Sequence, residues 1–166
     1  MNDPNIQTAL RSKSVSESKE IRRDGRFVAY NNGTVLDTKT NLMWASKDNG
    51  SNINWQNAKS YCEHYRAGGY SDWRLPTQNE LAALYSFENY VTYKSTCTYV
   101  SLFVDRKYDL RTTELIRLTC VALWASDTRS SQTAYFHFSE GRKYWDYPSN
   151  DDRFRALPVR SVKQGT

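Results

Sequence analysis

The sequence predicts an α+β fold, in which two helices pack on a small antiparallel sheet beside a long irregular loop region. Three observations lead to this class. Short apolar runs of strand type occur near both ends of the chain, two segments with helical periodicity lie between them, and a stretch without clear periodicity follows the helices. The length of 166 residues is typical of one domain, and the aromatic content of 14% is far from that of a disordered chain.

The beginning of the chain is predicted to be a flexible arm or linker, covering residues 1–25. It contains several serines among alternating charges and almost no apolar periodicity. Residues 1–4 lack an apolar h-region, so they are not predicted to belong to a signal peptide. The pattern changes at Arg26, and the folded domain is therefore predicted to span residues 26–166.

Three short strands are predicted at the start of this domain. Residues 27–30 and 34–36 are apolar runs on either side of Asn32-Gly33, a dipeptide that favours a type I′ hairpin turn. Residues 42–44 form the third run. These elements predict an antiparallel meander before the first helix.

Two helices are predicted next. Asn54 is a typical N-cap, apolar residues follow at helical spacing, and the glycines at 68–69 are expected to end this helix. The second helix is predicted to begin with a capping box, in which Thr77 and Glu80 satisfy each other's backbone amides. Pro76 precedes this cap.

The second half of the chain is predicted to return to strands. Residues 89–120 mix Tyr, Thr and charged residues with only short apolar runs, and they are expected to form an extended loop region with a short strand. From residue 121 onward, apolar residues recur at every second position, as in a strand, and Glu140-Gly141 is predicted to form a tight turn. The four predicted strands are 121–126, 134–138, 143–147 and 157–162.

The segment between the two helices contains Asp72, Trp73 and Arg74 side by side. Periodicity does not explain this grouping. We expect Arg74 to form a fork-like pair with a nearby carboxylate beneath Trp73, which would fix the chain between the helices. A structural role is therefore expected for this segment rather than ligand binding. The residues expected to act structurally are Asp72, Trp73, Arg74, Pro76, Thr77, Glu80 and Trp124.

The three cysteines allow two interpretations. Cys97 and Cys120 could form a disulfide across the stretch that they bracket, or Cys62, Cys97 and Cys120 could all be small buried hydrophobic residues. There is no Cys-x-x-Cys pair, and His64 and His137 are isolated. No zinc site is predicted.

No catalytic signature, metal site or cofactor is predicted. The chain has no phosphate-binding loop, dinucleotide fingerprint or complete nucleophile elbow. The acidic loop 149–152 could offer oxygen ligands to calcium, but such clusters are more often plain turns. The net charge of +5 is spread along the chain, and no apolar stretch is long enough to span a membrane. A nucleic-acid partner and membrane insertion are therefore not expected.

The segment 68–77 resembles the signature of the Lcl C-terminal domain family, which is named for a bacterial collagen-like adhesin. Four further stretches occur in the order typical of that family, and the likeness runs from about residue 26 to 163. They are 32–37 with 42–44, the Leu-Trp-Ala-Ser of 123–126, the turn at 138–141, and the Pro-Val-Arg-Ser-Val of 158–162.

The resemblance implies a C-type-lectin-like fold and a non-catalytic adhesin. Members of the family are typically exported, and the name-giving domain is a trimer that binds sulfated glycosaminoglycans. The chain departs from the family at Ser161, where a cysteine is usual, which implies that Cys62 lacks its partner. The calcium motifs of lectins are also absent. A secreted or cell-surface location is expected, although a cytoplasmic one stays open.

Ligand contacts are expected from basic residues of the loop region and the late strands, with aromatic side chains as stacking platforms. The expected partner is an anionic polysaccharide, because arginine matches sulfate geometry with two parallel hydrogen bonds. A protein ligand is the alternative, since the late segment is rich in Tyr, Ser and Asn. The basic candidates are Arg106, Lys107, Arg111, Arg117, Arg129, Arg142, Lys143, Arg153 and Arg155, and the aromatic ones are Tyr144, Trp145 and Tyr147.

Overall fold

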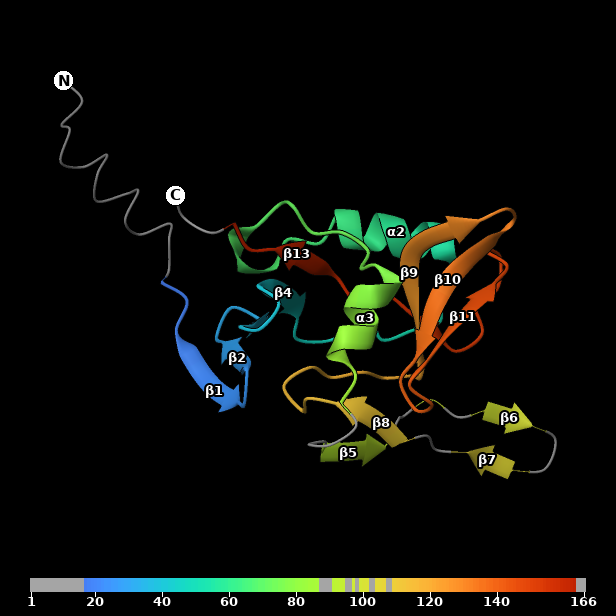
Figure 1. Cartoon of the computed structure of the whole chain (residues 1–166), viewed down its shortest axis with the longest axis horizontal. Helices are drawn as coiled ribbons and strands as arrows, with labels where there is room; N and C mark the ends of the chain where they lie inside the picture. The colour runs from blue at the N-terminus through green and yellow to red at the C-terminus, as the bar shows by residue number, and fades with distance from the viewer. Residues whose placement is uncertain are drawn as a thin grey trace, which may run out of the picture.

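The computed structural model describes residues 17–86, 91–94, 97, 99–101, 104–106 and 109–163, and it confirms a mixed α+β class (Figure 1). A five-stranded antiparallel sheet is formed by the beginning and the end of the chain, in the order β1-β2-β3-β4-β13. Its strands are β1 (Glu20–Asp24), β2 (Phe27–Tyr30), β3 (Thr34–Asp37), β4 (Leu42–Ala45) and β13 (Val159–Ser161).

A second sheet of four strands carries the late segment, in the order β11-β10-β9-β12. β9 and β12 pair in parallel, whereas the other pairs are antiparallel. The single small antiparallel sheet expected from the sequence is therefore wrong. The strands are β9 (Ala122–Arg129), β10 (Gln132–His137), β11 (Arg142–Asp146) and β12 (Phe154–Arg155), and two smaller pairs join β5 (Val91–Lys94) to β8 (Asp109–Thr112) and β6 (Tyr99–Ser101) to β7 (Val104–Arg106).

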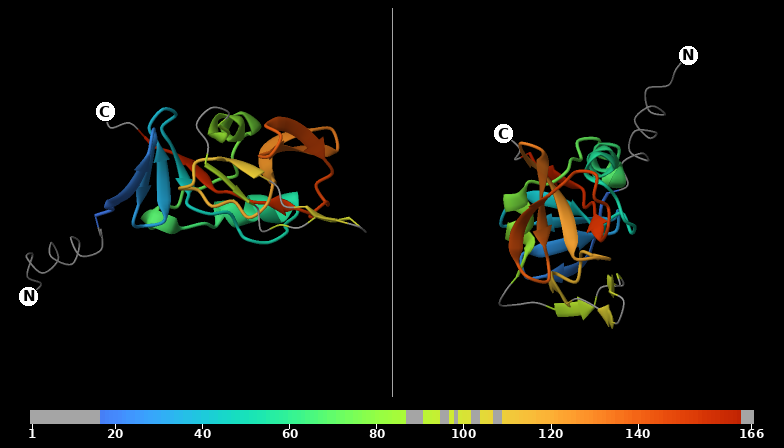
Figure 2. Two further views of the ribbon diagram at one scale, coloured as in Figure 1. Left: turned by 90° about the horizontal axis from the view of Figure 1, so that it is seen from below. Right: turned by 90° about the vertical axis from the view of Figure 1, so that its right-hand side faces the viewer.

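The two α-helices lie between these sheets. Figure 2 shows strands β1–β4 of the first sheet in blue and cyan at one end of the molecule and the second sheet in orange at the other, with the helices between. The helix α2 (Trp55–Glu63) begins at the predicted cap, where Asn54 Oδ1 accepts from the backbone of Asn57 at 2.9 Å. The helix α3 (Gln78–Leu84) packs against β9, β10 and β11. One buried apolar cluster extends from the first sheet through both helices to the second sheet.

The predicted flexible arm is wrong for residues 20–24, which form β1. This strand escapes a periodicity analysis because its side chains are largely exposed and charged. Backbone pairing with β2 holds it, and Arg22 forms an ion pair with Glu114 from a distant part of the chain. Residues 1–16 of the predicted arm lie outside the described residues.

The turn between β2 and β3 is also not the predicted type I′ turn. The loop has three residues, 31–33, and only Gly33 has a positive φ, of 82°. This is the geometry of a type I turn followed by a left-handed glycine. Asn32 Oδ1 accepts from the amide and the hydroxyl of Thr34, at 3.2 and 2.6 Å, which keeps Asn32 out of the left-handed region.

The helix α2 ends earlier than predicted. Its last residue is Glu63, and His64 is the C-cap. The guanidinium of Arg66 donates to the carbonyl oxygens of Glu63 and Tyr65 at 2.8 and 2.7 Å, so the helix end needs no glycine. The glycines at 68–69 instead belong to a short 3₁₀ turn, η1 (Ala67–Gly69).

The predicted fork of Arg74 is present, and its partner is Glu80. The two guanidinium nitrogens donate to the two carboxylate oxygens at 2.7 and 2.9 Å. The same carboxylate accepts from the amide of Thr77 at 2.8 Å, which completes the predicted capping box. One carboxylate therefore caps α3 and also holds the segment that precedes it. Pro76 lies buried just before the cap, and its carbonyl accepts from Ser126 of β9 at 2.8 Å.

The neighbours of Arg74 have partners of their own. Trp73 is buried, and its indole N–H donates to the carbonyl of Ala67 at 3.2 Å. Asp72 accepts two hydrogen bonds from Arg160 of β13, at 2.6 and 3.2 Å. The guanidinium of Arg160 also lies 3.8 Å from the ring centroid of Tyr70. The whole segment is therefore tied to the last strand of the first sheet.

Glu80→Ala is expected to lower the free energy of unfolding by about 2–3 kcal/mol, since it removes a helix cap and two hydrogen bonds to a charged group. Burial raises the pKa of Glu80, and the hydrogen bonds from Arg74 and Thr77 outweigh this, so the pKa lies below its ordinary value. The stabilisation by the carboxylate is therefore complete above the ordinary glutamate pKa and disappears as the pH falls through the lowered one.

Glu80→Gln is the matched control, because glutamine at this position still accepts from Thr77. It is expected to cost about 1 kcal/mol at neutral pH and to flatten the loss of stability at acidic pH. Urea unfolding at several pH values measures both effects. Equal costs for the two variants at pH 7 would show that the charge of Glu80 accounts for the whole effect and that an uncharged cap contributes nothing.

Candidate ligand-binding site

The edge strand β11 separates the late-strand candidates onto the two faces of the second sheet. In its pairing with β10, Tyr144 lies opposite Tyr135 and Trp145 lies opposite Ala134. Because side chains alternate along a strand, Lys143 and Trp145 share the face that α3 covers, whereas Arg142 and Tyr144 share the other face. The predicted residues thus form two sites of different character.

On the face toward α3, the structure brings together Arg129, Lys143 and Trp145, which we call the basic stripe. The guanidinium of Arg129 lies 4.5 Å from the ring centroid of Trp145 and donates to Gln132 at 3.2 Å. Lys143 donates to the side chain of Asn79. Neither cation forms an ion pair with a carboxylate among the described residues, so both can accept an anion.

The opposite face forms a pocket of about 220 Å³, which we call the acidic pocket. Its aromatic wall is Tyr135, whose ring stacks on Tyr144 at 5.4 Å between centroids. Three carboxylates line it, and each has a local partner. Glu140 accepts from the Tyr144 hydroxyl, Asp146 accepts from the amide of Asn150 at 3.0 Å, and Asp152 lies 3.6 Å from Arg153.

The charge of the acidic pocket is unsuited to a polyanion. Burial lowers the pKa of His137, the nearby Glu140 opposes this, and Arg153 lowers the pKa further. His137 is therefore uncharged at neutral pH, and Arg153 remains as the basic group that lines the pocket beside three carboxylates. Burial and the neighbouring Asp146 raise the pKa of Tyr135, so its hydroxyl also stays protonated.

Arg155 is not a surface contact, and its prediction as a ligand-binding residue is wrong. Its exposed fraction is 7%, because β12 places it inside the second sheet beside β9. Its guanidinium donates to Thr119 Oγ1 at 2.8 Å and to Asn52 Oδ1 at 2.6 Å. The hydroxyl of Thr119 in turn donates to the buried carboxylate of Asp48 at 2.8 Å. Burial lowers the pKa of Arg155, and Asp48 opposes that change.

The remaining basic candidates are dispersed. Arg111 lies half-buried in β8, and Arg117 is exposed next to Lys47, with which it forms an isolated parallel bridge. Lys47 is a neighbour that sequence analysis misses, because the two residues meet only through folding. Arg106 lies in β7, but its side chain is not described, and Lys107 lies outside the described residues.

A groove of about 430 Å³ lies at the start of α2, and sequence analysis did not predict it. We call it the neutral groove, because none of its lining side chains is ionisable. The turn between β9 and β10 forms one wall, the first turn of α2 forms another, and the loop after β11 closes it. Its lining residues are Asn54, Trp55, Gln56, Thr128, Ser130, Ser131, Gln132, Thr133, Pro148 and Ser149.

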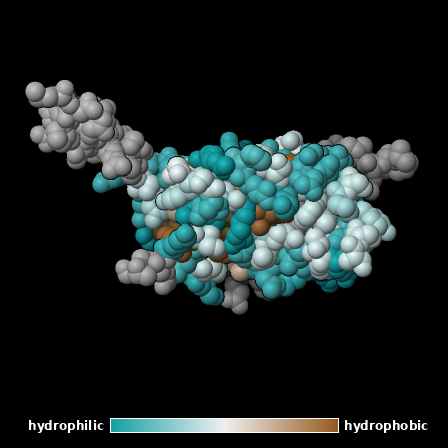
Figure 3. All heavy atoms as spheres, turned by 90° about the horizontal axis from the view of Figure 1, so that it is seen from above, coloured by the Kyte–Doolittle hydropathy of each residue, from teal (hydrophilic) through white to brown (hydrophobic). Residues whose placement is uncertain are grey.

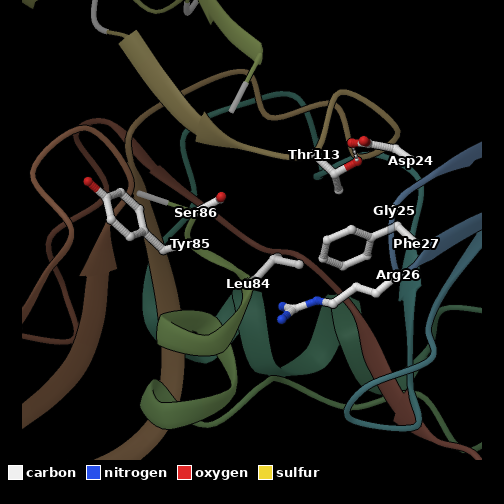
Figure 4. A pocket seen from close by; sticks show the side chains of 8 residues that line it. All are labelled: Asp24, Gly25, Arg26, Phe27, Leu84, Tyr85, Ser86 and Thr113. Atoms are coloured by element: carbon white, nitrogen blue, oxygen red, sulfur yellow. Dashed lines mark hydrogen bonds between the residues drawn. The ribbon is translucent and has the colours of Figure 1, made fainter. Parts of the chain in front are cut away.

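A third cavity, of about 240 Å³, lies between the β1–β2 turn and the end of α3 (Figure 4). Phe27 and Leu84 form its apolar surface. The carboxylate of Asp24 stands at its rim and accepts from the hydroxyl of Thr113 at 2.7 Å. Arg26 lines the cavity as well, so it combines an apolar base with one acidic and one basic side chain.

The cysteines follow one of the two interpretations left open. Cys97 and Cys120 form a disulfide, and Cys62 is a free thiol buried in the core. Burial raises the pKa of Cys62, so the thiol stays protonated. Ser161 stands where the family resemblance implies a cysteine paired with Cys62, and its hydroxyl accepts a hydrogen bond from Arg74 at 3.0 Å.

The described surface shows neither a metal site nor a membrane segment. Within the described ranges no group of three or more His, Cys, Asp or Glu residues could hold a metal ion. No helix in that part of the chain is long and apolar enough to cross a membrane. Figure 3 shows one face of the molecule, where hydrophilic residues dominate and apolar ones form only small separate spots.

Comparison with known proteins gives one match. The family model described as the Lcl C-terminal domain matches residues 33–160, which is most of the chain. No curated protein and no solved structure shows significant similarity to the chain. The matched range includes both helices and the basic stripe.

Proposed function

The chain belongs to the Lcl C-terminal domain family, and from this premise we propose that it is a non-catalytic bacterial surface domain that binds anionic, sulfated glycans. The observation that carries the proposal is the basic stripe. Arg129 and Lys143 present two cations on one face, without carboxylate partners among the described residues, beside the aromatic ring of Trp145. A sulfate group needs such cations, and a sugar ring packs well beside an aromatic side chain.

The geometry of Arg129 favours anion binding. Its guanidinium is held against Trp145 by a cation–π contact and to Gln132 by one hydrogen bond, so it is ordered before a ligand arrives. A guanidinium has five N–H donors in a fixed fork, and most of them remain available for a sulfate. Lys143 adds a second positive charge on the same face, at the edge of the sheet.

Several finer features belong to the same proposal. We propose a C-type-lectin-like arrangement, export from the cell and a homo-oligomer, which the family resemblance implies to be a trimer. The Cys97–Cys120 disulfide supports export, because disulfides persist in oxidising compartments.

The second candidate function is protein recognition. The observation that favours it is the wall of Ser, Thr, Gln and Asn side chains in the neutral groove, a composition typical of protein-binding loops. Tyr147, just after β11, has an exposed fraction of 59%. A protein ligand would bind with a weaker dependence on salt than a sulfated glycan.

The test is a double variant, Arg129→Gln with Lys143→Gln, measured against heparin across a salt titration. Its dissociation constant is expected to rise about tenfold, since two exposed ionic contacts of about 0.5–1 kcal/mol each are lost. The salt dependence is expected to become shallower, because its slope counts the ionic contacts. Size-matched dextran sulfate serves as the control polyanion.

The matched control variant is Arg23→Gln with Lys59→Gln. It removes the same residue types and the same net charge, but both cations are already paired, with Glu20 and Glu63. Its heparin affinity is expected to change less than twofold. Equal losses for the two double variants, or equal binding of heparin and dextran sulfate by the wild type, would contradict a specific glycan site.

A further inference from the structure

We infer that the neutral groove is the second part of the glycan site, and that it takes an uncharged sugar unit next to the sulfated unit that contacts Arg129. This inference rests on the proposed function and names the ligand segment that the basic stripe alone does not accommodate. The groove is nearly twice the volume of the acidic pocket, at about 430 against 220 Å³.

The chemistry of the groove matches a sugar ring. Sugar hydroxyls both donate and accept hydrogen bonds, and so do the hydroxyl and amide side chains that line the groove. Because no lining side chain carries a charge, a sugar can replace the bound water without stripping an ion of its hydration. Trp55 and Pro148 add apolar surface for the C–H faces of the ring.

The walls of the groove are fixed before binding. The amide of Trp55 donates to the carbonyl of Pro148 at 3.1 Å, which ties the start of α2 to the loop after β11. The indole N–H of Trp55 donates to the carbonyl of Ala125 at 2.8 Å, which ties the same residue to β9. A preformed groove loses little conformational entropy on binding.

Gln132 connects the groove to the basic stripe. Its side chain lines the groove, and its amide oxygen accepts from Arg129 at 3.2 Å. Thr128 also lines the groove, but side chains alternate along β9, so it lies on the face opposite Arg129, and Gln132 is the residue that reaches both sites. A glycan held by its sulfate at Arg129 therefore reaches the groove across Gln132, beside the turn between β9 and β10.

The two other cavities described above are poorer neighbours for such a ligand. The acidic pocket presents Glu140, Asp146 and Asp152, and their charge would repel an anionic chain. The cavity beside α3 has Asp24 and Arg26 in its lining, which offset each other in charge, but no residue of the second sheet lines it. Of these three, the neutral groove is therefore the one that shares a lining residue with the basic stripe.

The test is to fill the groove with Ser131→Phe, and to use Ser71→Phe as the matched control on an exposed loop away from it. Binding is measured by calorimetry at several salt concentrations, with a heparan sulfate hexasaccharide in which an uncharged N-acetylglucosamine unit stands next to a sulfated uronate unit. Ser131→Phe is expected to raise the dissociation constant about tenfold at every salt concentration, with an unchanged slope, because it removes non-ionic contacts only. Gln56→Ala is expected to act in the same direction and more weakly.

The indole N–H resonance of Trp55 gives a second readout. It is expected to shift when the hexasaccharide binds to the wild type and to the Ser71→Phe variant, and to stay in place in Ser131→Phe. If Ser131→Phe binds like the wild type while the Arg129 and Lys143 double variant is weakened, the groove is not contacted, and this inference fails while the proposed function stands. A changed salt slope in Ser131→Phe would mean that the substitution acts through Arg129, and it would also overturn the inference. Absence of heparin binding by the wild type overturns the proposed function and this inference with it.

Discussion

Arg155→Met is expected to lower the free energy of unfolding by about 3 kcal/mol, because breaking a buried charged network by removing one member costs about 3–5 kcal/mol. Methionine replaces the length of the arginine stem but donates no hydrogen bond. Thr119 and Asn52 then each lose the hydrogen bond from Arg155, and the buried Asp48 loses a compensating cation. Burial already raises the pKa of Asp48, so a further rise is expected in the variant.

The matched control is Arg142→Met, which makes the same chemical change at an exposed position of β11. Its cost is expected to stay within about 0.5 kcal/mol, as for most surface substitutions. Denaturant unfolding of both variants measures the difference, and heparin binding of the folded Arg155→Met protein is expected to equal that of the wild type. A stable Arg155→Met protein with reduced heparin affinity would restore Arg155 to the ligand-binding residues.

Elements with a local cause were predictable from the sequence. The cap at Asn54 and the box of Thr77 and Glu80 depend on residues within one helical turn, and both are confirmed. The fork of Arg74 was predictable because Glu80 is only six residues away. The strands β2, β4, β9 and β10 were predictable because each buries apolar residues against the core.

Features that depend on distant partners were not predictable in this way. The strand β1 is exposed and charged, and only its register with β2 makes it a strand. Nothing in the sequence around Arg160 and Arg155 distinguishes them from arginines that lie on the surface. Their partners at Asp72 and Thr119 lie far away in the sequence, so folding alone shows that both guanidinium groups are buried.

The candidate site was predictable in its residue types but not in its geometry. Alternation along β11 separates Lys143 from Arg142, but the face that α3 covers follows only from the fold. The pairing of Arg129 with Trp145 needs the register across three strands. The neutral groove is formed by three segments whose composition is that of ordinary loops, so the sequence carries no signal for it.

The second large effect is expected for Trp124→Ala, which should lower the free energy of unfolding by about 3–5 kcal/mol. The indole is fully buried, so its removal leaves a cavity in the core. Trp124 stacks on Phe154 at 3.8 Å between centroids, and its N–H donates to the carbonyl of Ile53 at 2.9 Å. A second bond runs in the opposite direction, from the indole N–H of Trp55 to the carbonyl of Ala125 in β9. The two tryptophans thus join β9 to the start of α2 from both sides.

Trp124→Phe separates packing from this reciprocal connection. Phenylalanine keeps an aromatic ring against Phe154 but leaves the carbonyl of Ile53 without its donor, at an expected cost of about 1–2 kcal/mol. Because Ile53 precedes the residues that wall the neutral groove, the variant should also loosen that wall and shift the Trp55 indole resonance in the absence of ligand. Unfolding in urea with an unchanged m-value, together with that resonance, measures both effects. A Trp124→Phe protein that is as stable as the wild type, with an unshifted Trp55, would show that packing alone positions the start of α2.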